Sequence, residues 1–294
     1  MNKLIVLLSF LFIYTASFSQ EVTEDKFPME NSSLLWNISG NGMEHNAYLF
    51  GTIHIIPESQ YFFPDTLLAI NTGVDLVILE IDLGASMIEA MNKLMLEEGT
   101  FFDFVTPEQK DTILAWAEKT LDMTPSKFEQ LFGKMKPFVI ATLAMTSGGD
   151  EPMESYDLNI TDHAKKAEID IEGLETFEEQ LDMFETTSRE DQIEMLMAAI
   201  RDGNTTNEQT DEMTSIYLGQ NIDSLYIFAT AEGPFEMDQK IFLDDRNKRW
   251  IPKIIAAFTE QDVLIAVGAG HLGGPNGVVR LLRREGYTVT PIKL

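Results

Sequence analysis

The sequence predicts an α/β fold with a central mixed, mostly parallel sheet built from the N- and C-terminal parts of the chain. Apolar, β-branched runs of strand length lie near both ends, at 47–53, 74–81 and 262–267, and helical patterns fill the middle. The last segment alternates strand, helix and strand, which is the order of a parallel β-α-β unit. The 294 residues are 44% hydrophobic, which is sufficient for a packed core.

Residues 1–19 are predicted to be a secretory signal peptide. Lys3 gives the basic start, residues 4–14 form the apolar stretch, and Ser17-Phe18-Ser19 is a small-x-small cleavage site before Gln20. The apolar stretch is well short of the roughly 20 residues that a membrane-spanning helix needs. We therefore expect cleavage, export to the periplasm or the extracellular space, and no membrane span in the mature chain.

The first expected elements follow a polar, flexible leader at 20–33. A strand at 34–39, turn residues Gly40-Asn41-Gly42 and a strand at 47–53 form a hairpin that ends at His54. A short helix at 64–71 then precedes a strand at 74–81. This strand is almost continuously apolar, as expected for a strand that is buried on both faces, and Glu80 interrupts it near its end.

A large helical insertion, at about 84–258, is expected to cap the site described below. Thr106-Pro107 and Thr124-Pro125 each place a capping hydroxyl before a helix-starting proline. Within the insertion we expect a helix at 157–167 and a short strand at 169–173, and the polar stretch 201–211 is predicted to be a flexible connection.

The C-terminal part supplies the last three predicted elements. These are a strand at 262–267, a helix at 277–285 and a strand at 287–292. Residues 34–294 are thus predicted to form a single domain.

The composition limits the possible functions. The chain has no cysteine, so it has no disulfide and no thiol nucleophile. Its net charge is −27, and it becomes −28 without Lys3, the one charged residue of the signal. Such a surface repels phosphate backbones, so we expect no nucleic-acid partner and a cationic or neutral substrate.

The main functional signal is a phrase that occurs twice, Gly51-Thr52-Ile53-His54 and Gly268-Ala269-Gly270-His271. Each copy follows a predicted strand, and it contains one of the four histidines of the chain. If the strands run parallel, His54, Glu80 and His271 converge at the carboxyl edge of the sheet. Two imidazoles and a carboxylate can hold a divalent metal that activates water, or they can act as acids and bases without metal. The glycines are expected to permit turns above a crowded site.

Other motifs give weaker signals. The run from Gly268 to Gly273 fits the dinucleotide pattern G-x-G-x-x-G, but the next strand ends the protein and offers no acidic residue for a ribose. No G-x-S-x-G elbow and no H-E-x-x-H helix occurs. His45 and His163 are predicted to face solvent.

Arg246 and Asn247 begin a helix before the final β-α-β unit. An arginine there could hold a substrate carboxylate or stabilise an oxyanion. The alternative is a surface salt bridge with Asp244 or Asp245.

Five segments together resemble the TraB/GumN family, which includes the Tiki-type membrane metalloproteases. They are YLFGTIHI at 48–55, LVILEID at 76–82, IEGLET at 171–176, DDRN at 244–247 and the block at 263–292. The resemblance implies an α/β core related to erythromycin-esterase-like and haem-binding ChaN-like proteins.

For the site, the resemblance implies His54, Glu80 and His271 together with Arg246 and Asn247. Asp157 and Glu175 match further family positions, to which no role is assigned. For the Tiki branch it implies divalent-metal-dependent peptide cleavage, with manganese or cobalt favoured and zinc possible. Tiki proteins are membrane-anchored, whereas this chain is expected to have no anchor, because it ends at Leu294 directly after the last predicted strand.

The leading hypothesis is a metal-dependent hydrolase, a peptidase acting on a peptide or protein substrate. His54, Glu80 and His271 would bind the metal, with Glu80 as ligand or general base, and Arg246 and Asn247 would orient the scissile carbonyl. One alternative is a non-catalytic protein that binds haem or a peptide in the same crevice. The other is an esterase that uses His54 as a metal-free base.

Overall fold

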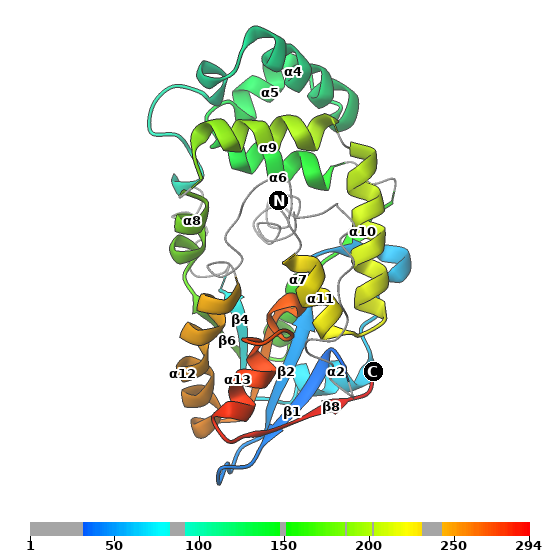
Figure 1. The fold of residues 1–294 in the computed structure, drawn as a ribbon, viewed down its shortest axis with the longest axis vertical. Coiled ribbons are helices and arrows are strands. Elements are labelled where there is room, and N and C mark those ends of the chain that lie inside the picture. The colour runs from blue at the N-terminus through cyan, green and yellow to red at the C-terminus, as the bar shows by residue number, and fades with distance from the viewer. Residues whose placement is uncertain (1–31, 83–91, 148–150, 186, 202, 231–242) are drawn as a thin grey trace. The chain divides into compact units, whose positions relative to one another are not determined.

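The computed structural model describes residues 32–294 except 83–91, 148–150, 186, 202 and 231–242 (Figure 1). The expected signal peptide and almost all of the expected leader lie outside the described residues. Contacts divide the chain into two compact units. Among the described residues, the helical unit takes its members from Leu83–Pro152 and Phe177–Asp211, and the sheet unit takes its members from 32–82, Met153–Thr176 and Glu212–Leu294.

The sheet unit is built on a six-stranded mixed sheet with the order β6-β4-β7-β2-β1-β8. Its strands are β1 (Leu35–Ser39), β2 (Ala47–Thr52), β4 (Leu76–Ile81), β6 (Asp170–Glu175), β7 (Val263–Gly268) and β8 (Thr288–Ile292). The four strands β6, β4, β7 and β2 are mutually parallel, while β1 is antiparallel to both β2 and β8. The predicted mixed, mostly parallel sheet is confirmed, and β6 adds an edge strand from the middle of the sequence.

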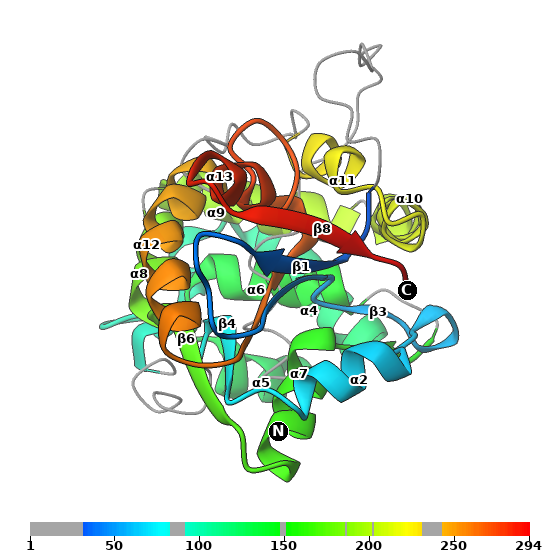
Figure 2. The same cartoon turned by 90° about the horizontal axis from the view of Figure 1, so that it is seen from below.

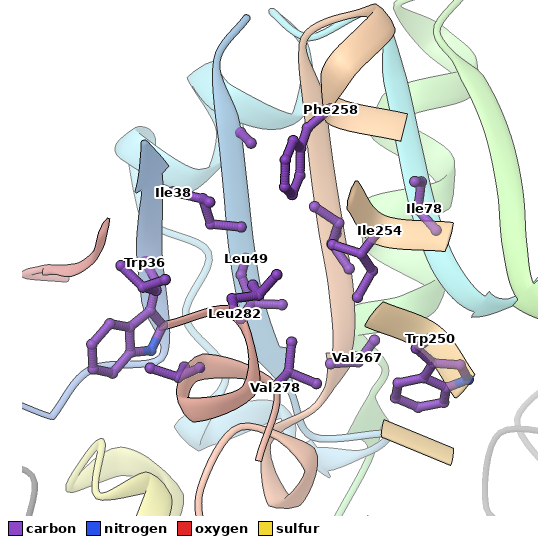
Figure 3. Close-up of a cluster of buried hydrophobic side chains, with 14 of the residues drawn as sticks. Trp36, Ile38, Leu49, Ile78, Trp250, Ile254, Phe258, Val267, Val278 and Leu282 are labelled. Carbon is purple, nitrogen blue, oxygen red and sulfur yellow. The ribbon is translucent and has the colours of Figure 1, made fainter. Parts of the chain in front are cut away.

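Helices cover both faces of this sheet, as Figure 2 shows. The α-helices that lie wholly in the sheet unit are α2 (Asp65–Asn71), α7 (Tyr156–Lys166), α11 (Ile222–Ala229), α12 (Asp245–Glu260) and α13 (Val278–Arg284). Helices α12 and α13 pack on one face, and α2 and α7 pack on the other. The strands alternate accordingly: Ile265 and Val267 of β7 join the first core, while Leu264 and Ala266 join the second. Figure 3 shows the first core, where Trp250, Ile254 and Phe258 of α12 meet the sheet.

Two short 3-10 helices and a small second sheet complete this unit. The 3-10 helices are η1 (Glu58–Gln60) and η4 (Ala269–His271), and the small sheet pairs β3 (Ile56–Pro57) with β5 (Met153–Glu154). The hairpin turn has the backbone that its residues predict, since Gly40, Asn41 and Gly42 all have positive φ.

The helical unit contains η2 (Phe101–Phe104), α4 (Pro107–Leu121), α5 (Pro125–Phe132), α6 (Pro137–Thr146), α8 (Phe177–Glu185) and α9 (Arg189–Arg201). Thr106 and Thr124 cap α4 and α5 as predicted, with each hydroxyl accepting a backbone N–H of the first turn. Helix α6 is almost wholly apolar and packs along α9.

The prediction of a flexible connection at 201–211 is wrong. These residues are helical, apart from residue 202, which is not described: 201 ends α9 and 203–211 belong to α10 (Gly203–Leu218). The polar composition of the stretch hid the helix, because α10 shows only a weak apolar stripe in the sequence. Within the described part of the chain, no helix is both long enough and apolar enough to cross a membrane.

Candidate functional site

Three neighbouring parallel strands bring His54, Glu80 and His271 to one edge of the sheet. His54 follows β2, Glu80 is the last but one residue of β4, and His271 ends η4 directly after β7. All three side chains surround Gly268, the last residue of β7. A Cβ built on Gly268 would lie 3.2 Å from Glu80 Oε1, 3.6 Å from His271 Cδ2 and 3.8 Å from His54 Nε2. The missing side chain of Gly268 thus leaves the space around which these groups converge.

Arg246 joins these groups from the first turn of α12. Its side chain is fully buried, and its Nη2 donates to Glu80 Oε2 at 2.6 Å. Its Nη1 lies 3.1 Å from His271 Nε2. Its Cζ also lies 4.7 Å from the centroid of the Trp250 ring, one turn further along the helix. The predicted alternative of a surface salt bridge with Asp244 or Asp245 is therefore wrong, because Arg246 points into the sheet.

Glu175, the last residue of β6, holds the other side of this guanidinium. Arg246 Nε donates to both carboxylate oxygens of Glu175, at 3.2 Å and 3.0 Å. Arg249 donates to the same carboxylate at 3.2 Å, but its side chain is 54% exposed whereas that of Glu175 is 3% exposed. A buried arginine therefore lies between two buried carboxylates, Glu80 and Glu175, which together compensate its charge.

His271 is held by neutral and cationic groups. Its Nδ1 lies 2.7 Å from Asn247 Oδ1, and its Nε2 faces Arg246. Because a guanidinium only donates, these partners place the proton on Nδ1 and leave Nε2 as the acceptor. The amide nitrogen of Asn247 donates to the carbonyls of His271 and Asn276, at 3.3 Å and 2.9 Å. Asn247 thus fixes both the ring and the backbone of His271.

His54 is held by a carboxylate instead. Its Nδ1 lies 2.9 Å from Asp157 Oδ2, and the Thr52 hydroxyl donates to Asp157 Oδ1 at 3.3 Å. Asp157 lies in the first turn of α7. The proton of a neutral His54 is therefore expected on Nδ1, so that Nε2 turns towards Gly268.

These surroundings separate the proton affinities of the three central groups. Burial alone would raise the pKa of Glu80, but Arg246 and the two histidines hold it well below its usual value. Burial and Arg246 lower the pKa of His271 to about 3, against the attraction of Glu80. At His54 burial also opposes protonation, yet Asp157 and Glu80 raise the pKa above its ordinary value of 6.5. Near neutral pH the site thus contains an ionised Glu80, a neutral His271 and a more basic His54.

A family model matches residues 34–291, which is nearly the whole chain. The chain belongs to the TraB/PrgY/gumN family. No curated protein and no solved structure matches it. The family match confirms the resemblance, and the candidate site residues lie inside the matched range.

In this TraB/PrgY/gumN chain the two motif glycines serve close packing rather than turns. Neither Gly51 nor Gly268 has a positive φ. A Cβ on Gly51 would lie 2.7 Å from Leu272 Cδ1 and 2.9 Å from Ala269 Cβ, so this glycine lets the loop that carries His271 lie against β2. The expectation that the glycines supply turns is therefore corrected.

The donor set fits a divalent metal in its chemistry. Both histidines have Nδ1 occupied by an orienting acceptor, which is the usual arrangement of imidazoles that bind a metal through Nε2. Arg246 restricts metal binding by His271. The lone pair of His271 Nε2 accepts a hydrogen bond from the Arg246 guanidinium, so this nitrogen cannot bind a metal at the same time. Within the described ranges, no three histidine, cysteine, aspartate or glutamate side chains are grouped closely enough to hold a metal ion. His54 Nε2 and Glu80 Oε1 are the other two candidate donors beside Gly268, and Glu80 Oε1 also accepts the N–H of Gly268 at 2.7 Å.

Asp157 and Glu175 have no role assigned from the sequence, although the structure places both against the central residues. A signal was present, because Asp157 begins the predicted helix at 157–167 and Glu175 closely follows the predicted strand at 169–173. The two remaining histidines lie outside the site. His45 pairs with Asp262 at 3.4 Å, and the ring of His163 lies 5.0 Å from the ring of Phe63 in a tilted arrangement, so both histidines are partly buried rather than solvent-facing as predicted.

Proposed function

We propose that this protein is an exported metal-dependent hydrolase, a peptidase that uses a metal-activated water. The observation that carries the proposal is the convergence of His54, Glu80 and His271 around Gly268. Two imidazoles and a carboxylate at the carboxyl edge of a parallel sheet form a donor set that suits a divalent ion with open positions.

His54 and Glu80 would hold the ion, and His271 would be a third donor only if its Nε2 is released from Arg246. When bound, the ion would acidify a water molecule and polarise a carbonyl oxygen. Arg246 orients Glu80 through the 2.6 Å hydrogen bond and supplies buried positive charge beside the oxygen on which negative charge develops. Both ends of the Asn247 amide are bound to the protein, so we assign it to the positioning of His271 rather than to contact with the scissile carbonyl.

A second candidate is a metal-free hydrolase, such as an esterase, with His54 as the general base. The contact of Arg246 with His271 Nε2 favours it, because that contact removes one of the three metal donors. In this candidate His54 Nε2 takes a proton from water and the water oxygen forms a bond to the carbonyl carbon. The bond between that carbon and the alkoxide oxygen then breaks, and His54 returns the proton to the departing oxygen.

One experiment separates the two candidates. The purified protein is treated with a chelator and assayed on a peptide library and a simple ester, with manganese, cobalt and zinc returned one at a time. We expect activity to disappear and to return with manganese or cobalt. Activity that persists in chelator supports the metal-free candidate, and absence of all hydrolysis by folded protein contradicts both.

Matched variants locate the activity. His54→Ala and His271→Ala should abolish hydrolysis, and the double variant should lose the bound metal measured in the purified wild type. His45→Ala, a histidine outside the site, should behave as the wild type. A Soret band on haem titration that depends on His54 or His271, without hydrolysis, would instead favour the haem-binding alternative.

Export has its own test. If residues 1–19 are a signal peptide, the protein recovered outside the cytoplasm should begin at Gln20, as read by mass spectrometry of the intact chain. A chain that retains Lys3 in that compartment would contradict cleavage.

A further inference from the structure

The carboxylate of Asp157 bridges two residues of the first G-x-x-H motif. One oxygen lies 2.9 Å from His54 Nδ1 and the other accepts from the Thr52 hydroxyl at 3.3 Å. The side chains of His54 and Asp157 are only 10% and 13% exposed. Water therefore competes weakly for this contact, and a charge-assisted hydrogen bond in such surroundings fixes geometry strongly.

The small second sheet joins the segment that carries His54 to the segment that carries Asp157. β3 begins two residues after His54, and β5 ends three residues before Asp157. These strands pair with each other, with Ile56 opposite Glu154. The backbone that follows His54 is thus hydrogen-bonded to the backbone that precedes α7. These main-chain hydrogen bonds set the distance between His54 and Asp157.

The first turns of α7 are also fixed from several sides. Ser155 caps the helix, since its hydroxyl accepts the N–H of Leu158 at 3.4 Å. Tyr156 is fully buried, and its hydroxyl donates to the Phe62 carbonyl at 2.6 Å. These contacts keep Asp157 on a rigid element, which is what an orienting residue requires.

The second motif supplies the contrast. His271 Nδ1 faces the neutral Asn247 oxygen, whereas His54 Nδ1 faces an acidic side chain. An acceptor at Nδ1 leaves the lone pair of a neutral imidazole on Nε2. At His54 this nitrogen lies 3.8 Å from the position that a Cβ of Gly268 would take, next to Glu80.

We propose that Asp157 is the positioning residue of His54, which fixes its proton on Nδ1 and directs Nε2 into the space beside Gly268. The proposal rests on the proposed function, in which His54 acts through Nε2 as a metal donor or as a base. It assigns Asp157 no contact with substrate.

The test reads the tautomer of His54 directly. The protein is labelled with ¹⁵N-histidine, and the ring nitrogens of its four histidines are observed by NMR in mildly alkaline buffer. His54→Gln identifies the His54 signals. We expect a protonated Nδ1 and an unprotonated Nε2 in the wild type, and a shift of the proton towards Nε2 in Asp157→Ala.

Asp162→Ala is the matched control, because it removes an acidic residue from the same helix whose side chain is 70% exposed. It should leave the His54 spectrum unchanged. If Asp157→Ala does not fold, Asp157→Ser is used, since serine suits the first turn of a helix and is too short to reach His54. A wild-type proton on Nε2, or a spectrum that neither Asp157 variant changes, overturns the proposal.

Kinetics give a second readout. Asp157→Ala should lower kcat by about 10- to 100-fold with little change in KM, as is usual when the orienting partner of a catalytic imidazole is lost. An unchanged kcat contradicts the proposal. The NMR measurement of the tautomer does not depend on catalytic activity. If the wild type hydrolyses nothing, the proposed function is contradicted, but NMR still decides the assignment of Asp157.

Discussion

The two G-x-x-H motifs place their histidines at the same edge of the sheet in opposite electrostatic surroundings. β2 and β7 are parallel neighbours, and Thr52 pairs with Gly268 in their register. Beyond these ends His54 meets Asp157, whereas His271 meets Asn247 and Arg246. The same G-x-x-H pattern therefore yields one imidazole with a raised pKa and one with a pKa of about 3.

The motif therefore sets the position of each histidine ring, and the residues that contact the ring set its pKa. At catalytic sites, two titratable groups of the same kind often take different roles because their surroundings give them different pKa values. His54 is suited to take up a proton, whereas His271 is suited to remain neutral.

Arg246→Met should have the largest effect, because it leaves Glu80 and Glu175 buried without their shared cation. Loss of one partner of a buried ion pair typically costs about 3–5 kcal/mol in the free energy of unfolding. Urea denaturation measures this cost. Lys248→Met is the control, since its ion pair with Asp245 is partly exposed and its removal should cost less than about 1 kcal/mol. Equal costs for the two variants would contradict the burial argument.

The two histidines should contribute to stability in opposite pH ranges. The pKa of His271 is lowered in the folded state, so its contribution is present above 6.5 and is lost as the pH falls from 6.5 towards 3. The pKa of His54 is raised, so its contribution is present below 6.5 and is lost as the pH rises through the folded-state value. The effect at His271 should be on the order of a few kcal/mol.

This prediction is measured as the free energy of unfolding across pH in the wild type, His54→Gln and His271→Gln. The His271 variant should lose part of the acid dependence, and the His54 variant should lose the decrease above 6.5. If the free energy of unfolding falls with acid to the same extent in the wild type and in His271→Gln, the pKa of His271 is not lowered in the folded state and the predicted difference between the two rings is wrong.

The two motif glycines should respond differently to an added methyl group. Gly51→Ala places a Cβ within 2.7 Å of Leu272 and 2.9 Å of Ala269, so we expect a loss of about 1–3 kcal/mol in stability. The Cβ of Gly268→Ala would meet Glu80 Oε1 at 3.2 Å and fill the space between the two histidines, so activity should suffer more than folding. Thermal unfolding and hydrolysis are compared for both variants, and the reverse pattern would contradict these roles.

Arg249→Ala should have the smallest effect. It shares Glu175 with Arg246, but its side chain is half exposed, so solvent weakens the ion pair. We expect a change of less than about 1 kcal/mol in the free energy of unfolding. A cost as large as that of Arg246→Met would mean that Arg249 is a structural part of the buried charge network.

Much of the sheet could be predicted because its signals are local. The apolar run at 74–81 matches β4, and the predicted strand at 262–267 matches β7 to within one residue at each end. Strand ends followed by histidines indicated the edge at which the site lies, because parallel strands present their carboxyl ends together. The helix α10 was missed because its sequence is polar and its apolar stripe is weak.

The order of the elements, the edge of the sheet and the histidines at that edge thus follow from local sequence signals, because periodicity and turn chemistry act over a few residues. Tertiary structure alone decided the partners: Arg246 meets Glu80 from 166 positions away, and Asp157 meets His54 from 103 positions away. Burial makes such partners necessary, because a charge removed from water must be compensated nearby. Which side chain provides the compensation depends on how the strands and helices pack, and this packing makes two copies of the G-x-x-H pattern chemically different.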